Sequence, residues 1–214
     1  MRCCRIKPES IDVKKVLSPD EIKILTVKKF NKNGLLYYDD SVKFIILKEG
    51  RAKSVLYKDG HDFTLCHVLK NNFYILSIDS VLEFTEYSEI YIVTEKLLFS
   101  KLFKNNSFMN LVIYSIDRSL QLQRDIIQDL VFNSCKKRVI SFLIDAANTI
   151  GIKQKNGSVL VDIDMSISEL STFIASKRQT ISFIINELQH DGLLEKVDTH
   201  RYIIENITAL KNIE

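Results

Sequence analysis

Between about residues 30 and 99, hydrophobic and polar positions alternate in short runs, and this period of two predicts β-strands. Turn residues such as Gly50 and Asp59-Gly60 separate the runs. Short strands with a turn signal roughly every ten residues are typical of a small barrel or sandwich. The predicted strands are 42–47, 52–57, 62–69, 73–78, 81–85 and 90–93.

Residues 8–29, before these strands, are predicted to be mainly helical. Ser18-Pro19-Asp20-Glu21 marks a helix start, with a hydroxyl cap, a proline in the first turn and then acids.

A change to helical period follows at about residue 95, and residues 106–133 contain neither glycine nor proline. Hydrophobic positions there recur at alternating spacings of four and three, which is a heptad pattern with one polar member. The pattern fits a helix packed on its own barrel or a helix that pairs with a second copy. Apolar flanks, including Leu111, Val112 and Ile126, widen the stripe, so one helix could do both. The predicted dimer seam is Met109, Ile113, Ile116, Leu120, Gln123, Ile127 and Leu130.

Two short helices joined by a tight turn are predicted after residue 165. A capping box at Ser166 and Glu169 begins the first, and a second start follows at Ser176-Lys177-Arg178-Gln179. The second helix keeps its period up to Asp191-Gly192, so the pair forms a helix-turn-helix. An earlier helix at 134–150, a hairpin around 155–158 and a second hairpin at 193–204 frame the motif.

Residues 165–194, MSISELSTFIASKRQTISFIINELQHDGLL, resemble the winged helix-turn-helix of the Crp/Fnr transcription regulators. The upstream order of barrel, long helix and Arg138 early in the next helix agrees with that family. The resemblance implies an α+β fold with three parts. These are a cyclic-nucleotide-binding-like β-barrel (jelly roll) at 1–105, a dimerisation helix at 106–133, and a winged helix-turn-helix DNA-binding domain at 134–214.

The resemblance also implies roles for particular residues. In this family the second helix of the motif enters the major groove, and dimers bind pseudo-palindromic operators. The expected base contacts are Arg178, Gln179 and Ser182, and the expected phosphate contacts are Ser166, Lys177 and Thr180. The expected hinge between the long helix and the DNA-binding domain is Phe132, Asn133 and Ser134. In a protein without this motif, an arginine at a helix start is more often an ordinary solvated residue.

Three positions depart from the family pattern. Gln179 stands where glutamate is frequent, and Phe183 stands where arginine is frequent. A phenylalanine cannot form a hydrogen bond with a base edge, although it can touch a thymine methyl group. Ala175 replaces the glycine of the turn, which is tolerable if its φ stays negative. These changes predict an operator that differs from the commonest sites of the family.

Composition narrows the function classes. The chain has 214 residues, of which 46% are hydrophobic, and a net charge of +3, which is weak support for nucleic-acid binding. Six glycines, never closer than six residues apart, exclude a glycine-rich dinucleotide loop. No apolar run is long enough for a spanning helix, so no membrane partner is predicted. Four cysteines without C-x-x-C spacing favour a reducing, cytoplasmic location.

No cofactor is predicted. The run 69–81 has neither the Gly-Glu pair nor the arginine with which family members hold a cyclic phosphate, so binding of cAMP or cGMP is not expected. The cysteine spacing does not fit an iron–sulfur cluster. Haem would need an inward axial ligand, and Cys66 and His67 are neighbours on a strand, so only one of them can face inward. Thiol sensing through Cys3, Cys4 or Cys66 competes with the simpler reading of Cys66 and Cys135 as buried, inert residues.

The leading hypothesis is a homodimeric, sequence-specific DNA-binding transcription regulator that does not depend on cyclic nucleotides. RNA polymerase is a further expected partner. A ligand-binding or scaffold module with the same barrel and no DNA regulation is the alternative. An enzyme is not expected, because the four histidines are scattered and no catalytic motif is present. Either a signal in the barrel shifts the long helices, or the protein is already competent to bind DNA and is controlled by its abundance.

Overall fold

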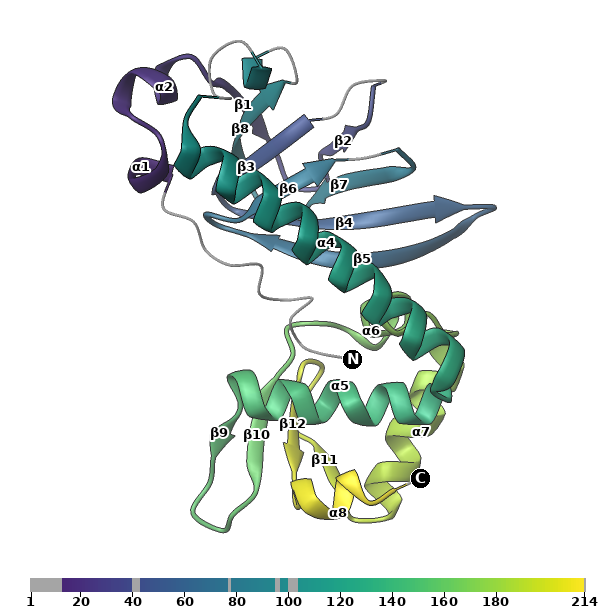
Figure 1. The fold of residues 1–214 in the computed structure, drawn as a ribbon. Coiled ribbons are helices and arrows are strands. Elements are labelled where there is room, and N and C mark those ends of the chain that lie inside the picture. Colours follow the sequence, from purple (N-terminus) through teal and green to yellow (C-terminus); the bar gives the residue numbers. More distant parts are fainter. Residues whose placement is uncertain (1–12, 40–42, 77, 95–96, 100–103, 214) are drawn as a thin grey trace. The chain divides into compact units, whose positions relative to one another are not determined.

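The computed structural model describes residues 13–39, 43–76, 78–94, 97–99 and 104–213 (Figure 1). Contacts divide the chain into two compact units, one extending to Gln123 and the other covering Arg124 to the C-terminal end.

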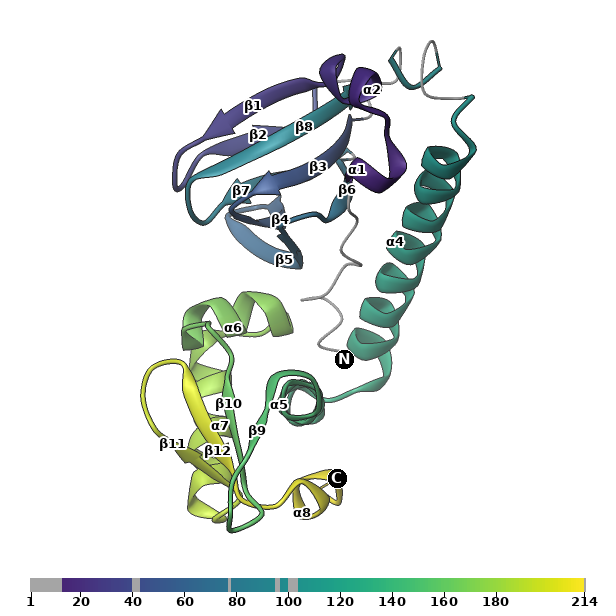
Figure 2. The same cartoon turned by 90° about the vertical axis from the view of Figure 1, so that its left-hand side faces the viewer.

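Two four-stranded antiparallel sheets stack face to face in the first unit (Figure 2). Their strand orders are β1-β8-β3-β6 and β2-β7-β4-β5. All six strands expected from the alternating pattern are present within a few residues of their predicted bounds. The elements are α1 Val13–Val16, α2 Pro19–Lys23, β1 Thr26–Phe30, β2 Leu35–Tyr37, β3 Lys43–Glu49, β4 Arg51–Lys58, β5 His61–Leu69, β6 Phe73–Leu76, β7 Ser80–Phe84 and β8 Ser88–Thr94.

The prediction of helix up to residue 29 was wrong at its end. The helix start at Ser18 is present, and the Ser18 and Glu21 side chains form a capping box. The helix stops at Lys23, however, and Thr26–Phe30 is strand β1, which pairs with β8. This strand has almost no alternation because four of its five residues are exposed, so tertiary pairing rather than pattern determines it.

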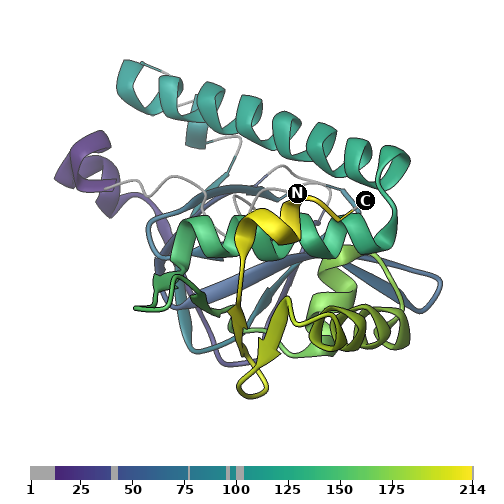
Figure 3. The same ribbon diagram turned by 90° about the horizontal axis from the view of Figure 1, so that it is seen from below.

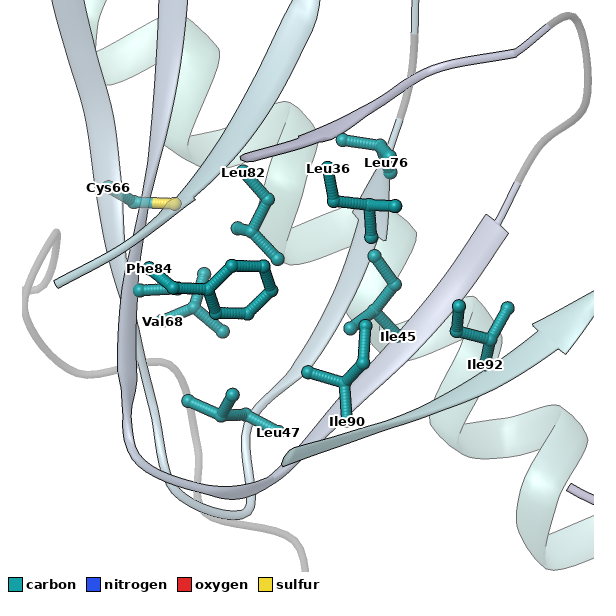
Figure 4. Packing of buried hydrophobic residues seen from close by; sticks show 11 residues of the cluster. Leu36, Ile45, Leu47, Cys66, Val68, Leu76, Leu82, Phe84, Ile90 and Ile92 are labelled. Atoms are coloured by element: carbon teal, nitrogen blue, oxygen red, sulfur yellow. The ribbon is translucent and has the colours of Figure 1, made fainter. Parts of the chain in front are cut away.

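A hydrophobic cluster fills the space between the two sheets (Figure 4). Phe84 lies at its centre and stacks on Phe30, with ring centroids 4.2 Å apart. The buried members come from seven strands of both sheets: Leu36, Ile45, Leu47, Ala52, Cys66, Val68, Leu76, Leu82, Phe84, Ile90 and Ile92. The Cys66 side chain therefore belongs to the barrel core.

The long helix α4 (Asn106–Phe132) covers the other face of the β1-β8-β3-β6 sheet with its first turns. Phe108 and Val112 are buried in a second cluster with Phe44, Phe73 and Val93. The predicted seam divides along the helix: Met109 is half-buried against this cluster, whereas the later positions are exposed. The exposed seam positions are Ile113, Ile116, Leu120, Gln123, Ile127 and Leu130.

Helices on a small sheet form the second unit. Its sheet order is β11-β12-β10-β9, and α8 lies beside α5 (Figure 3). The elements are α5 Cys135–Ile150, β9 Ile152–Lys153, β10 Val159–Asp162, α6 Ile167–Ile174, α7 Arg178–His190, β11 Leu194–Lys196, β12 Arg201–Ile204 and α8 Ile207–Lys211.

Helices α6 and α7 form the predicted helix-turn-helix, and the turn between them contains one strained residue, Ala175. Ala175, which ends α6, has φ 57° and ψ 59°, so it is left-handed, and the condition under which alanine replaces glycine without strain, a negative φ, is not met. The reason is the sharpness of the turn: the Ala175 and Ser176 N–H groups both reach back to the Ser171 carbonyl oxygen. Alanine in this region is strained because its Cβ approaches the following carbonyl oxygen.

Arg138 in the first turns of α5 holds this turn. Its side chain is 8% exposed, and the guanidinium donates to three carbonyl oxygens. Nε donates to Ile174 at 3.1 Å, Nη2 to Ala175 at 3.2 Å and Nη1 to Asn133 at 2.9 Å. One side chain therefore joins the end of α6 to the segment between α4 and α5.

Ala175→Gly is expected to stabilise the protein. Glycine removes a left-handed strain of about 1–2 kcal/mol from the folded state. It also gives the unfolded chain more conformational freedom, which costs about 0.5–1 kcal/mol of stability. The free energy of unfolding should therefore rise by about 0.5–1 kcal/mol. Differential scanning calorimetry of the full chain should show a midpoint about 2 °C higher. As the matched control, Ala147→Gly inside α5 should lower it, because that alanine is already helical. A lower midpoint for Ala175→Gly would contradict the strain argument.

Arg138→Met should destabilise the second unit by about 2–4 kcal/mol, because three carbonyl oxygens lose a charged donor. Hydrogen–deuterium exchange should accelerate in α6 and the first turn of α7. Arg118→Met on α4 removes an arginine that has an exposed hydrogen bond to Gln121, and it should change stability by under about 0.5 kcal/mol. Equal exchange in the two variants would show that the Arg138 bonds do not hold the turn.

Candidate DNA-binding site

Helix α7 has a buried face and an outward face. Ile181, Ile184, Ile185 and Leu188 are buried, and their spacing places them on one side of the helix. The remaining face is exposed and carries Arg178, Gln179, Ser182, Phe183 and Asn186. The core therefore determines which side chains of α7 point away from the unit.

The first turn of α7 is positively charged. Lys177 occupies the N-cap without forming a side-chain cap hydrogen bond, Arg178 follows it, and no acidic residue lies in the first turn. A helix N-terminus carries a partial positive charge, so these two cations add to it. Such an end attracts phosphate groups.

The predicted base-contacting residues lie together on this helix. Arg178, Gln179 and Ser182 are all exposed, and their side chains form no hydrogen bond or ion pair with any residue that the structure describes. Their polar groups are thus available to an external partner, and an arginine fork or a glutamine amide can form two hydrogen bonds with one base.

The predicted phosphate-contacting residues lie on two helices. Lys177 and Thr180 are exposed at the start of α7. Ser166 instead caps α6: its hydroxyl accepts from the Glu169 N–H at 3.3 Å and donates to the Glu169 carboxylate at 2.8 Å. The Ser166 hydroxyl therefore already has a role in the fold.

A rigid turn joins the two strands of the wing, β11 and β12. The Asp198 carboxylate accepts from the N–H groups of His200 and Arg201, both at 2.9 Å, and from Arg201 Nε at 2.6 Å. The backbone hydrogen bond from His200 and the pairing with Arg201 lower the pKa of Asp198 to about 2. Asp198 therefore remains ionised at neutral pH, and its hydrogen bonds persist.

The predicted hinge residues have defined contacts. Phe132 is 78% exposed at the end of α4. Asn133 donates to the Asp129 carboxylate at 2.8 Å, and its carbonyl oxygen accepts from Arg138. Ser134 caps α5 by accepting from the Lys137 N–H at 3.2 Å.

Two contacts that position α7 were not anticipated. Lys136 on α5 forms an ion pair with Glu187 on α7 at 2.8 Å, and Cys135 Sγ donates to Ser176 Oγ at 3.1 Å. These pairs are 51 and 41 residues apart, so no local pattern could indicate them. Arg138 had been singled out only by the family resemblance, with no contact assigned.

The segment where family members hold a cyclic phosphate is compact here. Lys70 and Asn71 form a tight turn, in which Asn72 accepts from the Leu69 N–H at 2.6 Å. Strand β6 follows at once and pairs with β3 over Phe73–Leu76. Its backbone groups thus serve a sheet rather than converge on an anion.

Metal-binding residues do not cluster in the described ranges: no group of three His, Cys, Asp or Glu residues there could hold a metal ion. Cys66 is buried in the barrel core and Cys135 is half-buried; both are free thiols. Cys3 and Cys4 lie outside the described residues. None of the helices that the structure describes has the length and hydrophobicity to cross a bilayer.

Comparison with known proteins gives the same architecture. Residues 137–213 match the model of the Crp-like helix-turn-helix domain. The anaerobic regulatory protein of Bacillus subtilis (strain 168) is 21% identical over 230 residues, which cover 99% of this chain and 93% of that protein.

Solved structures show that the fold extends over the whole chain. A CooA mutant from Carboxydothermus hydrogenoformans superposes with a TM-score of 0.88 at 20% identity, covering 99% of this chain and 98% of that one. CprK in complex with OCPA gives 0.78 at 14% identity, covering 96% of this chain and 97% of that one. FixK2 from Bradyrhizobium japonicum gives 0.68 at 14% identity, over 89% and 98%.

These matches agree with the predicted fold and with the predicted motif at 165–194. The matched proteins are regulators rather than enzymes. The chain therefore carries a Crp-like helix-turn-helix domain, the DNA-binding part of such transcription regulators, at residues 137–213, and is similar over its whole length to regulators of the Crp/Fnr type.

Proposed function

We propose that the protein binds a pseudo-palindromic operator as a homodimer and reads each half-site with α7. Arg178 donates both arms of its guanidinium to a guanine, Gln179 pairs with an adenine, and Ser182 contacts a neighbouring base edge. The observation that carries this proposal is the exposed face of α7, where these polar side chains have no role within the fold.

Lys177 and Thr180 then contact backbone phosphates and set the register of α7 on the duplex. Their position at the cationic helix start supports this role. Ser166 is the third proposed phosphate contact. The hydroxyl has one proton, so in the complex it would donate to a phosphate oxygen in place of the Glu169 carboxylate, while its oxygen still accepts from the Glu169 N–H and keeps the cap.

The exposed row on α4 is the proposed dimer seam. Ile113 is 61% exposed, and large apolar side chains continue along the helix at heptad spacing. A second copy of the chain, presenting the same row, would bury these side chains in a parallel pair of helices. Gln123 would be the polar member of the seam, and Met109, which packs on the barrel, would contribute least.

Each of the three proposed parts has its own role: residues 1–105 receive a signal, residues 106–133 join two copies of the chain, and residues 134–214 bind DNA. Phe132, Asn133 and Ser134 form the hinge, and RNA polymerase is the second macromolecular partner. Since the bound regulator acts on transcription, we place it in the cytoplasm.

We propose that this barrel does not respond to a cyclic nucleotide. The tight Lys70-Asn71 turn and the absence of arginine from 69–81 support this. Related regulators respond to other molecules: CooA is a CO-dependent transcription factor, and CprK has been solved in complex with OCPA. Proteins of this fold thus differ in ligand, so the fold alone does not predict a cyclic nucleotide.

Arg178→Ala should weaken binding to the selected operator by at least about 30-fold, because the dimer loses one bidentate base contact of about 1–3 kcal/mol in each half-site. The operator would be selected from a random duplex library with the wild-type protein, and affinity measured by fluorescence anisotropy at several salt concentrations. Arg178→Lys keeps the positive charge but cannot form two hydrogen bonds with one guanine. Its affinity for the operator should therefore fall most of the way to that of Arg178→Ala, and the dependence of affinity on salt should be unchanged.

Lys177→Ala is the matched phosphate control and should reduce the salt slope by about two, one for each half-site, without changing the preferred sequence. Wild-type protein that selects no duplex would overturn the proposed function. Full affinity in Arg178→Lys would assign Arg178 to a phosphate.

Leu120→Lys should convert the dimer to a monomer, because two lysines would face each other across the seam. Sedimentation velocity should then give about the 24.8 kDa chain mass instead of twice that value. Gln121→Lys, at the next exposed position, has similar helix propensity and should leave the dimer intact. A Leu120→Lys dimer would show that another surface holds the two copies together.

A further inference from the structure

Phe183 is the one large apolar side chain of α7 that the core does not cover. It is 69% exposed, whereas Ile181, Ile184, Ile185 and Leu188 are at most 4% exposed. Phe183 forms no aromatic contact with any residue in the described ranges. Its exposure alone has no special meaning, since single apolar residues are common on protein surfaces.

Its position on the helix gives the exposure its meaning. Phe183 follows Gln179 by four residues, so the two side chains lie one above the other on the helix surface. With about 100° of rotation per residue, Gln179, Ser182, Phe183 and Asn186 fall within an arc of about 100° on the outward face. The phenyl ring is thus placed among the side chains proposed to read bases.

The chemistry of the major groove offers one partner for such a ring. Among the four base pairs, the thymine 5-methyl group is the only apolar group that the groove displays. A phenyl ring has no donor or acceptor, so against guanine O6 and N7 or the cytosine amino group it would displace water and leave those polar groups unpaired. The same ring therefore favours thymine and disfavours a G·C pair.

We propose that Phe183 is a specificity-determining residue, which packs on the methyl group of a thymine and selects an A·T pair next to the base read by Gln179. This inference rests on the proposed function, because it requires α7 to lie in the major groove. It goes beyond it by assigning one position of each half-site to an apolar contact.

A methyl-deletion scan tests the assignment. Each thymine of the selected operator is replaced in turn by deoxyuridine, which lacks only the methyl group. At one thymine per half-site, wild-type affinity should fall about fourfold, which is the effect of losing one buried methyl-sized group. Phe183→Ala should already have lost this contact, so the same replacement should leave its affinity unchanged.

A second arm restores the methyl group on a different base. At the assigned position, cytosine should bind wild-type protein more weakly than thymine, and 5-methylcytosine should recover part of the difference. Phe183→Ala should not distinguish cytosine from 5-methylcytosine. Ile152→Ala is the matched control, because Ile152 is a similarly exposed apolar residue (66%) on β9, and it should retain the wild-type scan.

The outcomes separate this inference from the function on which it rests. If wild-type protein binds an operator and Arg178→Ala weakens it, but Phe183→Ala shows the wild-type deoxyuridine scan, the Phe183 assignment is overturned and the proposed function stands. If wild-type protein selects no duplex, the proposed function fails first. The proposal is supported if replacing one thymine by deoxyuridine lowers the affinity of the wild-type protein and leaves the affinity of Phe183→Ala unchanged.

Discussion

The Arg138 guanidinium donates to carbonyl oxygens from two separate chain reversals, and the arrangement of the DNA-binding unit depends on it. Asn133 lies between α4 and α5, whereas Ile174 and Ala175 lie at the turn between α6 and α7. The last carbonyl groups of a helix have no partner inside the helix and carry a partial negative charge. A buried cation placed there satisfies them and in turn gains the hydrogen bonds that its own burial requires.

Arginine suits this place better than lysine would. Its planar fork projects several N–H groups in fixed directions, so one side chain can bridge carbonyl groups that point from different elements. Because Arg138 belongs to α5, the start of α7 is oriented relative to α5 and to the residues that follow α4. Lys136 and Glu187 add a second link between α5 and α7. The orientation of the outward side of α7 is thus set by the buried residues of the helix and by the ion pair of Glu187.

The strained Ala175 belongs to the same arrangement. A left-handed alanine persists only where the surrounding structure determines it, and here the Ser171 and Arg138 hydrogen bonds close the turn from both sides. Local preference and global fold disagree at this residue, and such disagreement is expected to concentrate at functional sites. The sequence predicted the turn and allowed alanine there without strain only at a negative φ, whereas the structure has a positive one.

Local signals predicted most of the fold, and long-range contacts explain what they missed. Capping boxes at Ser18 and Ser166 fixed two helix starts, since a cap needs only residues three apart. Strand β1 was missed because its side chains are mostly exposed and its partner, β8, lies far along the chain. At the candidate site, the outward residues of α7 could be predicted from its period, whereas the bonds of Arg138 span 36 and 37 residues and leave no local pattern.

This division of α7 into two faces has a consequence for how DNA specificity can change. The buried isoleucines and Leu188 tie the helix to its unit, while the outward side chains have no hydrogen bond or ring contact in the described part of the fold. Substitutions on the outward face should therefore alter the preferred operator and change the free energy of unfolding very little, since exposed positions without structural contacts usually tolerate substitution. Phe183, where the family resemblance implies arginine, would be such a change under the proposed function: the contacts that orient the helix are kept, and the side chain proposed to face the groove is different.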